Sequence, residues 1–206
     1  DAYNVDITMG TAYSYMSTRL HRTDAPWFYV GKTHEYLTNA YDDVGMEHVP
    51  DVSIYHNVSA NTNTEKRLRW LEDERLLLES WAEVPRHRTA FFLGQTYAAL
   101  RNWSQAFTWF ELRSKMGLRQ EEVYESRYQM AKMAERLPLY EWFEIEKMYL
   151  TTLEHKATRV ESLYELAYHY YELKDYETSY TYLTRAIQVE IPMGSKLYMR
   201  RELYEY

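Results

Sequence analysis

The pattern of apolar and polar residues changes about 60 residues into the chain. Before that point, residues 2–9 alternate between apolar and polar with a period of two, residues 11–22 are rich in Thr, Tyr and Ser, and residues 27–31 form a short buried-type run that ends at glycine. Each of these patterns favours a β-strand. Strands are therefore predicted in residues 2–9, 11–22, 27–31 and 51–58, and the segment 34–41 is expected to begin a short helix. Strands of this length do not close a stable core alone, so this segment needs a partner surface.

From residue 61 onward, apolar residues recur at helical spacing, and Thr64 is placed to cap the first helix. Pro85, Pro138 and Pro192 fall at connectors, where a missing N–H costs little. Helices are predicted over 64–83, 87–100, 103–116, 120–136, 139–153, 158–173 and 176–188, and a further helix is expected to begin within 195–206. The chain thus divides into a strand-and-loop segment, 1–60, and a helical region, 61–206.

The helical region contains a repeat of a large apolar residue, a small residue and, three positions later, Tyr or Ala. Met130 lies 37 residues after Leu93, and Leu166 lies 36 residues after Met130. The second half of the unit recurs as well, because Ala106, Phe110 and Arg113 match Ser179, Leu183 and Ala186. The middle unit, with Ala131 and Ala134, matches only in its first helix, so the register of its second helix is open.

This pattern resembles the tetratricopeptide (TPR) repeat, whose period is about 34 residues. A small residue in such a helix pair lets the two helices approach closely, and a large one fills the space beside it. The residues that carry the resemblance are Leu93, Gly94, Tyr97, Ala106, Phe110, Leu166, Ala167, Tyr170 and Ala186. The predicted fold class is mainly α: a TPR-like α-solenoid (an α-α superhelix) preceded by a short strand-and-loop segment. TPR solenoids bind proteins or peptides through their concave face.

The front segment resembles a different family. The stretches RLHRTDAPWFYVGKTHEYL (19–37) and VSIYHNV (52–58) are similar to the C-terminal edge of the catalytic domain in family-two, A-type-fold glycosyltransferases, which in one subgroup continue into TPR-like helices. The residues that carry this resemblance are Arg19, Arg22, Trp27, Tyr29, Gly31, His34, Glu35, Leu37 and His56. The chain also begins without Met in a predicted strand, so it is expected to be a fragment of a longer protein.

The glycosyltransferase resemblance implies roles for these residues. Glu35 would be the general base that takes a proton from the acceptor hydroxyl. His34 or His56 would bind the divalent metal, Mn or Mg, or the diphosphate, and Arg19 or Arg22 would pair with phosphate. No Asp-x-Asp metal motif occurs in the chain. A nucleotide sugar and a metal are therefore expected only in a full-length enzyme, no cofactor is expected here, and the chain is expected to be inactive alone.

Composition narrows the range of partners. The net charge is −7, from 31 acidic and 24 basic residues, which disfavours binding to nucleic acid. The chain has no cysteine, which excludes a disulfide framework and a thiolate zinc site and fits a reducing, cytoplasmic location. No apolar run reaches the roughly 18 residues that suggest a membrane span. The 22 tyrosines either pack between helices or line a groove for peptides or sugars.

Three interpretations remain open from the sequence. The first is the C-terminal part of a glycosyltransferase-like protein, whose TPR module binds a partner or the acceptor. The second is a stand-alone TPR scaffold for protein–protein interaction, in which His34 and Glu35 form only a local pair at a turn. The third is a homo-oligomer formed through the strands of residues 1–60, because unpaired strand edges favour pairing with a second copy.

Overall fold

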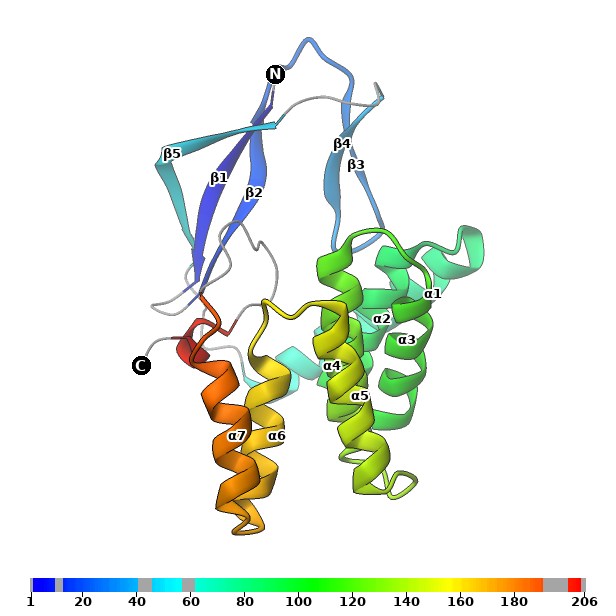
Figure 1. Cartoon of the computed structure of the whole chain (residues 1–206). Coiled ribbons are helices and arrows are strands. Elements are labelled where there is room, and N and C mark those ends of the chain that lie inside the picture. Colours follow the sequence, from blue (N-terminus) through cyan, green and yellow to red (C-terminus); the bar gives the residue numbers. More distant parts are fainter. Residues whose placement is uncertain (1, 10–12, 41–45, 57–61, 191–199, 205–206) are drawn as a thin grey trace. The chain divides into compact units, whose positions relative to one another are not determined.

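The computed structural model describes residues 2–9, 13–40, 46–56, 62–190 and 200–204, which form mainly helical structure after a short strand region (Figure 1). The chain divides into two compact units, Asp1–Ser80 and Trp81–Tyr206. The division falls near the end of helix α1 (Asn63–Glu83), whereas the sequence pattern changes near residue 60. Most of α1 therefore belongs with the strands.

The first unit contains a three-stranded sheet and a separate β-hairpin. Strand β1 (Ala2–Met9) lies in the middle of the sheet, antiparallel to β2 (Tyr13–His21) and parallel to β5 (Met46–His56). The hairpin pairs β3 (Trp27–Val30) with β4 (Tyr36–Asn39). Within the described residues, the predicted strands are confirmed, but the buried character expected for 27–31 is wrong, because Phe28 and Tyr29 of β3 are exposed.

The helix expected to begin within 34–41 is wrong, because Tyr36–Asn39 is strand β4. Gly31 has φ +116° and His34 has φ +51°, and these left-handed residues lie in the turn that reverses the chain after β3. The following backbone pairs with β3, and Leu37 becomes buried. A helix in this place would leave the N–H and C=O groups of β3 without their partners.

The second unit consists of helices joined by short connectors. They are α2 (His87–Ala99), α3 (Trp103–Lys115), α4 (Gln120–Ala134), α5 (Trp142–His155), α6 (Glu161–Glu172) and α7 (Tyr176–Ala186). Each helix falls within about four residues of its predicted bounds, which confirms the solenoid expected from the repeat. We call the pairs α2/α3, α4/α5 and α6/α7 the first, middle and last repeat.

The middle repeat departs from the other two at its connector. The connector between α4 and α5 covers 135–141, whereas α2 joins α3 through 100–102 and α6 joins α7 through 173–175. Helix α5 then begins with a capping box, in which the side chains of Glu141 and Glu144 bond each other's backbone N–H. The longer connector explains why the second helix of this repeat does not match the spacing of the others.

The helix expected within 195–206 is not found in the described residues. A single 3₁₀ turn, η1 (Arg201–Leu203), is present there, while 195–199 and 205–206 lie outside the described residues. The hydroxyl of Tyr204 lies 3.2 Å from the N–H of Val160 and 3.3 Å from Glu161 Oε2. These side-chain contacts tie the turn to the start of α6 in place of the backbone bonds that would extend a helix.

The residues of the TPR resemblance lie at the helix contacts. Those buried to below one-tenth exposure are Leu93, Gly94, Tyr97, Ala106, Phe110, Leu166, Ala167 and Ala186. A methyl group at Gly94 would lie 2.7 Å from the ring of Phe110, so only glycine allows α2 and α3 to approach this closely. Tyr170 is half-buried, and its hydroxyl donates to Glu146 of α5 at 2.9 Å.

Arg113 occupies the position that Ala186 takes in the last repeat, yet it is fully buried. Its guanidinium donates to the carbonyl oxygens of Gly117 at 2.9 Å and Leu118 at 3.0 Å, and to Glu122 Oε2 at 3.1 Å. Gly117, Leu118 and Arg119 all have positive φ, between 45° and 65°. Arg113 therefore stabilises this left-handed connector by satisfying the carbonyl groups of Gly117 and Leu118.

Candidate functional site

The predicted His-Glu pair lies in the turn between β3 and β4, beside α1. Thr33 Oγ1 donates to Asp73 Oδ1 at 2.7 Å, and His34 Nε2 lies 4.0 Å from Asp73 Oδ2. Lys32 Nζ donates to Glu79 of the same helix at 3.3 Å. Glu35 is exposed to solvent. The turn thus packs on α1 through polar contacts, and His34 faces a carboxylate.

The other residues of the glycosyltransferase resemblance are spread over the sheet. Arg19 is exposed on β2, and Arg22 forms a two-point ion pair with Asp24 at 2.9 and 2.5 Å. The backbone of His21, next to Arg22, pairs with Ala2, whereas His56 pairs with Met9 at the other end of β1. These ends are about 23 Å apart at the usual rise per strand residue. The structure therefore does not bring Arg22 and His56 together, and the roles implied for all five residues stay predictions.

Metal binding by His34 and His56 also stays a prediction. Among the described residues, no group of three or more His, Asp or Glu side chains is arranged to hold a metal ion. The side chain of His56 lies outside what the structure describes, although its backbone is part of β5.

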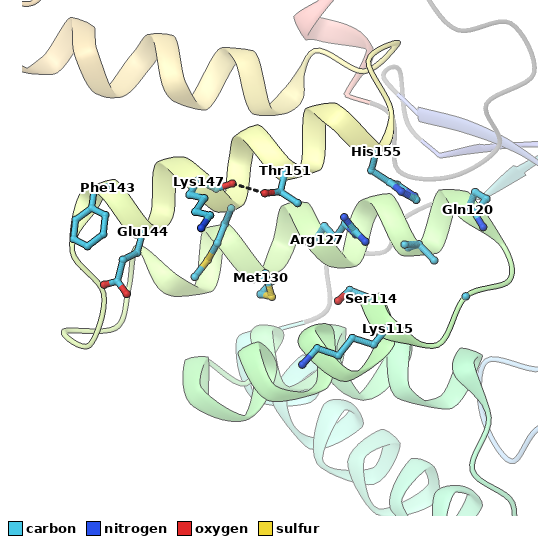
Figure 2. Close-up of a pocket in the computed structure, with 13 residues that line it drawn as sticks. Ser114, Lys115, Gln120, Arg127, Met130, Phe143, Glu144, Lys147, Thr151 and His155 are labelled. Carbon is cyan, nitrogen blue, oxygen red and sulfur yellow. Dashed lines mark hydrogen bonds between the residues drawn. The ribbon is translucent and has the colours of Figure 1, made fainter.

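The second unit has a groove over α4, between α3 and α5 (Figure 2). It has a volume of about 860 Å³ and is open to solvent. Its lining residues are Ser114, Lys115, Gly117, Gln120, Val123, Arg127, Met130, Phe143, Glu144, Lys147, Met148, Thr151 and His155. We call it the α4 groove. Helix α4 lines it with residues three or four positions apart, which places them on one face.

The α4 groove carries positive charge in a protein that is negative overall. Arg127, Lys115 and Lys147 line it, and the Nε atom of Arg127 is buried without a hydrogen-bond partner among the described residues. Burial, and then the positive charge of Arg127, lower the pKa of His155, so this imidazole is neutral at pH 7. The Nε atom itself is closed to solvent, and the Arg127 guanidinium keeps its charge at the groove lining, where a bound carboxylate would pair with it.

The negative charge on the groove lining comes from Glu144. Its carboxylate accepts the backbone N–H of Glu141 at 3.0 Å in the capping box of α5. Lys115 also has a partner, Glu111 Oε1, at 2.8 Å, but both side chains are largely exposed. The groove as a whole therefore combines apolar surface from Val123, Met130, Phe143 and Met148 with an excess of cationic groups. Such a surface suits an anionic segment with apolar side chains.

Sequence reasoning missed the α4 groove, although part of its signal was present. Lys147, Thr151 and His155 recur every four residues, and Gln120, Val123, Arg127 and Met130 follow a helical face. These spacings show which residues share a face once the helices are assigned. They do not show that this face stays open between α3 and α5.

Comparisons with known proteins support the fold and leave the function open. No family model matches the chain, and no curated protein sequence matches it. The chain is similar to the crystal structure of MamA, a TPR-repeat protein, with a TM-score of 0.50 and 12% identity over 64% of this chain and 76% of that chain. A second structure, MamA MSR-1 C2, has a TM-score of 0.46 and 16% identity over 61% and 70% of the two chains.

The similarity to MamA agrees with the repeat seen in the sequence. The chain is a TPR-like α-solenoid preceded by a short strand region. None of the helices in the described ranges combines the length and apolar character needed to span a bilayer. None of the comparisons points to a glycosyltransferase.

Proposed function

We propose that the chain is a protein-interaction scaffold whose α4 groove binds an acidic, partly apolar segment of a partner protein. The observation that carries the proposal is the excess of cationic groups, Arg127, Lys147 and Lys115, along the apolar lining of a groove of about 860 Å³. Solenoids of helical repeats offer extended surfaces of this kind to peptides and partner helices. The partner's carboxylates would bond Arg127 and Lys147, and its apolar side chains would cover Met130 and Phe143.

A peptide selection tests the proposed function. Short random peptides displayed on phage are selected on the full chain, and the recovered peptides are expected to be enriched in Asp and Glu beside apolar residues. A fluorescein-labelled recovered peptide is then titrated with the chain. Replacing Arg127→Gln and Lys147→Gln together is expected to weaken binding by about tenfold or more, since two ion pairs are lost.

The matched control removes the same charge elsewhere. Arg67→Gln with Arg69→Gln changes two exposed arginines on α1, in the other unit, and is expected to leave the affinity within about twofold. Binding to the α4 groove should also weaken as salt rises. Recovered peptides without acidic residues, or equal affinity for both double variants, would overturn the proposal.

A second hypothesis keeps the glycosyltransferase resemblance of residues 1–60, with Glu35 as the base of a longer enzyme. The observation in its favour is the left-handed backbone of His34, since strained non-glycine residues concentrate at functional sites. Sequencing the parent gene upstream of Asp1 tests it. An upstream domain with an Asp-x-Asp motif is expected, and an open reading frame that starts close to Asp1 would contradict it.

Self-association through the strands also remains a proposal. Within the described residues, β2 and β5 are the edges of the sheet, and β5 exposes Val52, Ile54 and Tyr55. Exposed edges with apolar side chains favour pairing with another copy. Light scattering across micromolar concentrations is expected to show a rising mass, and a constant monomer mass would remove this proposal.

A further inference from the structure

The outer face of the last repeat is unusually rich in exposed aromatic and aliphatic side chains. Helix α6 exposes Tyr164 by 40%, Tyr168 by 51% and Tyr171 by 56%, and α7 exposes Tyr180 by 71% and Leu183 by 40%. The three residues of α6 are four and three positions apart, so they form one stripe along the helix. We call the surface formed by these five residues the tyrosine face.

The tyrosine face has a hollow at its centre. The hollow has a volume of about 130 Å³ and lies between α6 and α7, where the small residues Ala167 and Ser179 meet. Tyr164, Tyr168, Tyr171 and Leu183 form its rim. Its lining is almost entirely apolar, and its size suits one or two apolar side chains of a partner.

The middle repeat shows what covers the corresponding surface inside this chain. Tyr128 of α4 lies 36 residues before Tyr164 and has the same place in its repeat, but it is only 1% exposed. Helix α6 lies over it: the Tyr128 hydroxyl donates to Glu165 Oε1 at 2.5 Å. One turn earlier, the Tyr124 hydroxyl donates to Glu161 Oε2 at 3.2 Å. The covering helix thus presents two carboxylates, one turn apart, to the tyrosines beneath it.

The junction between the first and middle repeats follows the same rule. There α4 covers α2, and Glu122 from the first turn of α4 faces Arg88 at 3.4 Å and His87 at 3.7 Å. In both junctions, therefore, a following helix places a carboxylate near a cationic or hydroxyl side chain on the first helix of the preceding repeat, although Glu122 also accepts from Arg113 of α3 at 3.1 Å. The described residues contain no such helix over α6, whose Tyr164 and Tyr168 rings stack in parallel at 6.1 Å.

We infer that the tyrosine face binds an amphipathic helix of a partner protein that carries two carboxylates one turn apart. One carboxylate accepts from the hydroxyl of Tyr164, as Glu165 accepts from Tyr128 of α4. The second, one turn further on, accepts from Tyr168, which stands where α4 has Lys132, itself a donor to Glu165 at 2.8 Å. An apolar side chain of the same helix fills the hollow over Ala167 and Ser179. This surface is separate from the α4 groove, which is lined by α3, α4 and α5.

The chain's own α6 supplies the probe, because it is the helix that covers the corresponding surface. A fluorescein-labelled peptide of residues 158–173 is titrated with the full chain, and binding is followed by fluorescence anisotropy. Saturable binding is expected, and replacing both glutamates in the peptide, Glu161→Gln and Glu165→Gln, should weaken it by about fivefold or more. In the full chain, Tyr168→Ala with Tyr180→Ala should weaken binding by about tenfold or more.

Two chain variants keep the inference falsifiable. Tyr164→Phe with Tyr168→Phe removes only the hydroxyls and is expected to weaken binding by a smaller factor, about threefold to tenfold. Tyr29→Ala changes a tyrosine of similar exposure on β3, in the other unit, and should leave the affinity unchanged.

Three results would overturn the inference. The first is the absence of saturable binding at millimolar peptide. The second is binding that Tyr168→Ala with Tyr180→Ala does not change, which would mean that the peptide replaces α6 on α4. The third is a dimer of the chain that the same double variant abolishes, since a second copy would then occupy the tyrosine face.

Discussion

The first and last repeats share their spacing but differ in what lies on top of them. Phe110 of α3 is 1% exposed, whereas Leu183, at the corresponding place in α7, is 40% exposed. Phe107 stacks on Tyr140 with ring centroids 5.0 Å apart, while its counterpart Tyr180 is 71% exposed. The spacing of the repeat thus fixes how two helices pair, and it does not fix whether a further helix covers the pair.

The two repeats also close their helix pairs with different side chains. In the first repeat, a glycine meets a phenylalanine ring, and no room remains for a methyl group at Gly94. In the last repeat, Ala167 and Leu183 take these positions and leave a hollow between α6 and α7. Glycine with phenylalanine and alanine with leucine both give a helix pair, but the hollow is found beside the alanine–leucine pair.

The largest effect is expected from removing the ring that fills the first repeat. Phe110→Ala leaves a cavity between α2 and α3, and a buried Phe→Ala change costs about 3–5 kcal/mol of the free energy of unfolding. The measurement is urea unfolding followed by the helical circular dichroism signal. Leu183→Ala, the matched change in the last repeat, is expected to cost less than about 1 kcal/mol because Leu183 is half exposed. Equal losses would show that the two repeats are packed alike.

A smaller loss of stability is expected from adding one methyl group at the contact between Gly94 and Phe110. Gly94→Ala places a carbon 2.7 Å from the Phe110 ring, and overpacking typically costs about 1–3 kcal/mol. The higher helix propensity of alanine offsets up to about 1 kcal/mol of this loss in the free energy of unfolding. Adding Phe110→Leu recreates the alanine–leucine pair of the last repeat and is expected to relieve the clash. In a double-mutant cycle, the double variant should therefore be more stable than the sum of the single changes predicts.

The sequence was most informative where the residue type alone determines the contact. Leu93, Gly94 and Phe110 could be assigned from their spacing, because two helices approach closely only at a small residue. Strand β4 could not be assigned, because the turn before it requires His34 to adopt φ +51°. No residue pattern in the sequence predicts this conformation. The apolar residues after the turn then fit a short helix as well as a strand.

Surfaces were harder to predict than helix contacts. The α4 groove draws its lining from three helices, so it exists only once those helices have packed against one another. The tyrosine stripe of α6 has a visible helical spacing, but the same spacing is buried at Tyr124 and Tyr128 in α4. Whether such a stripe is core or surface is decided by the next helix, which the local sequence does not show.

Removing a tyrosine hydroxyl is expected to cost more stability on α4, whose tyrosines are buried, than on α6, whose tyrosines are exposed. Tyr128→Phe removes the donor to Glu165 but leaves that carboxylate its contact with Lys132 at 2.8 Å. The expected loss is about 1 kcal/mol, because one hydrogen bond to a charged group disappears and the ring stays in place. Tyr164→Phe, the matched change on the exposed stripe, is expected to shift stability by less than about 0.5 kcal/mol. Urea unfolding of both variants under the same conditions makes the comparison, and a larger loss for Tyr164→Phe would reverse the assignment of covered and open stripes.

The smallest change in stability is expected from mild acid, which protonates one histidine in each of the three repeats. Burial lowers the pKa of His87, His155 and His169 below its ordinary value of 6.5. As the pH falls through 6.5, these imidazoles take up protons in the unfolded chain before they do so in the folded one, so the free energy of unfolding decreases.

The paired carboxylate Glu161 does not contribute in this window. Although burial opposes the shift, the hydrogen bonds and charge of Arg159 lower its pKa below the usual range, so its contribution is lost only in stronger acid. The midpoint of thermal unfolding is therefore expected to be lower at pH 5.5 than at pH 7.5, and His155→Gln should reduce this difference. The buried carboxyl of Glu125 acts in the opposite direction, because burial raises its pKa and the folded chain then takes up its proton first. A midpoint that rises toward pH 5.5 would mean that Glu125 outweighs the three histidines.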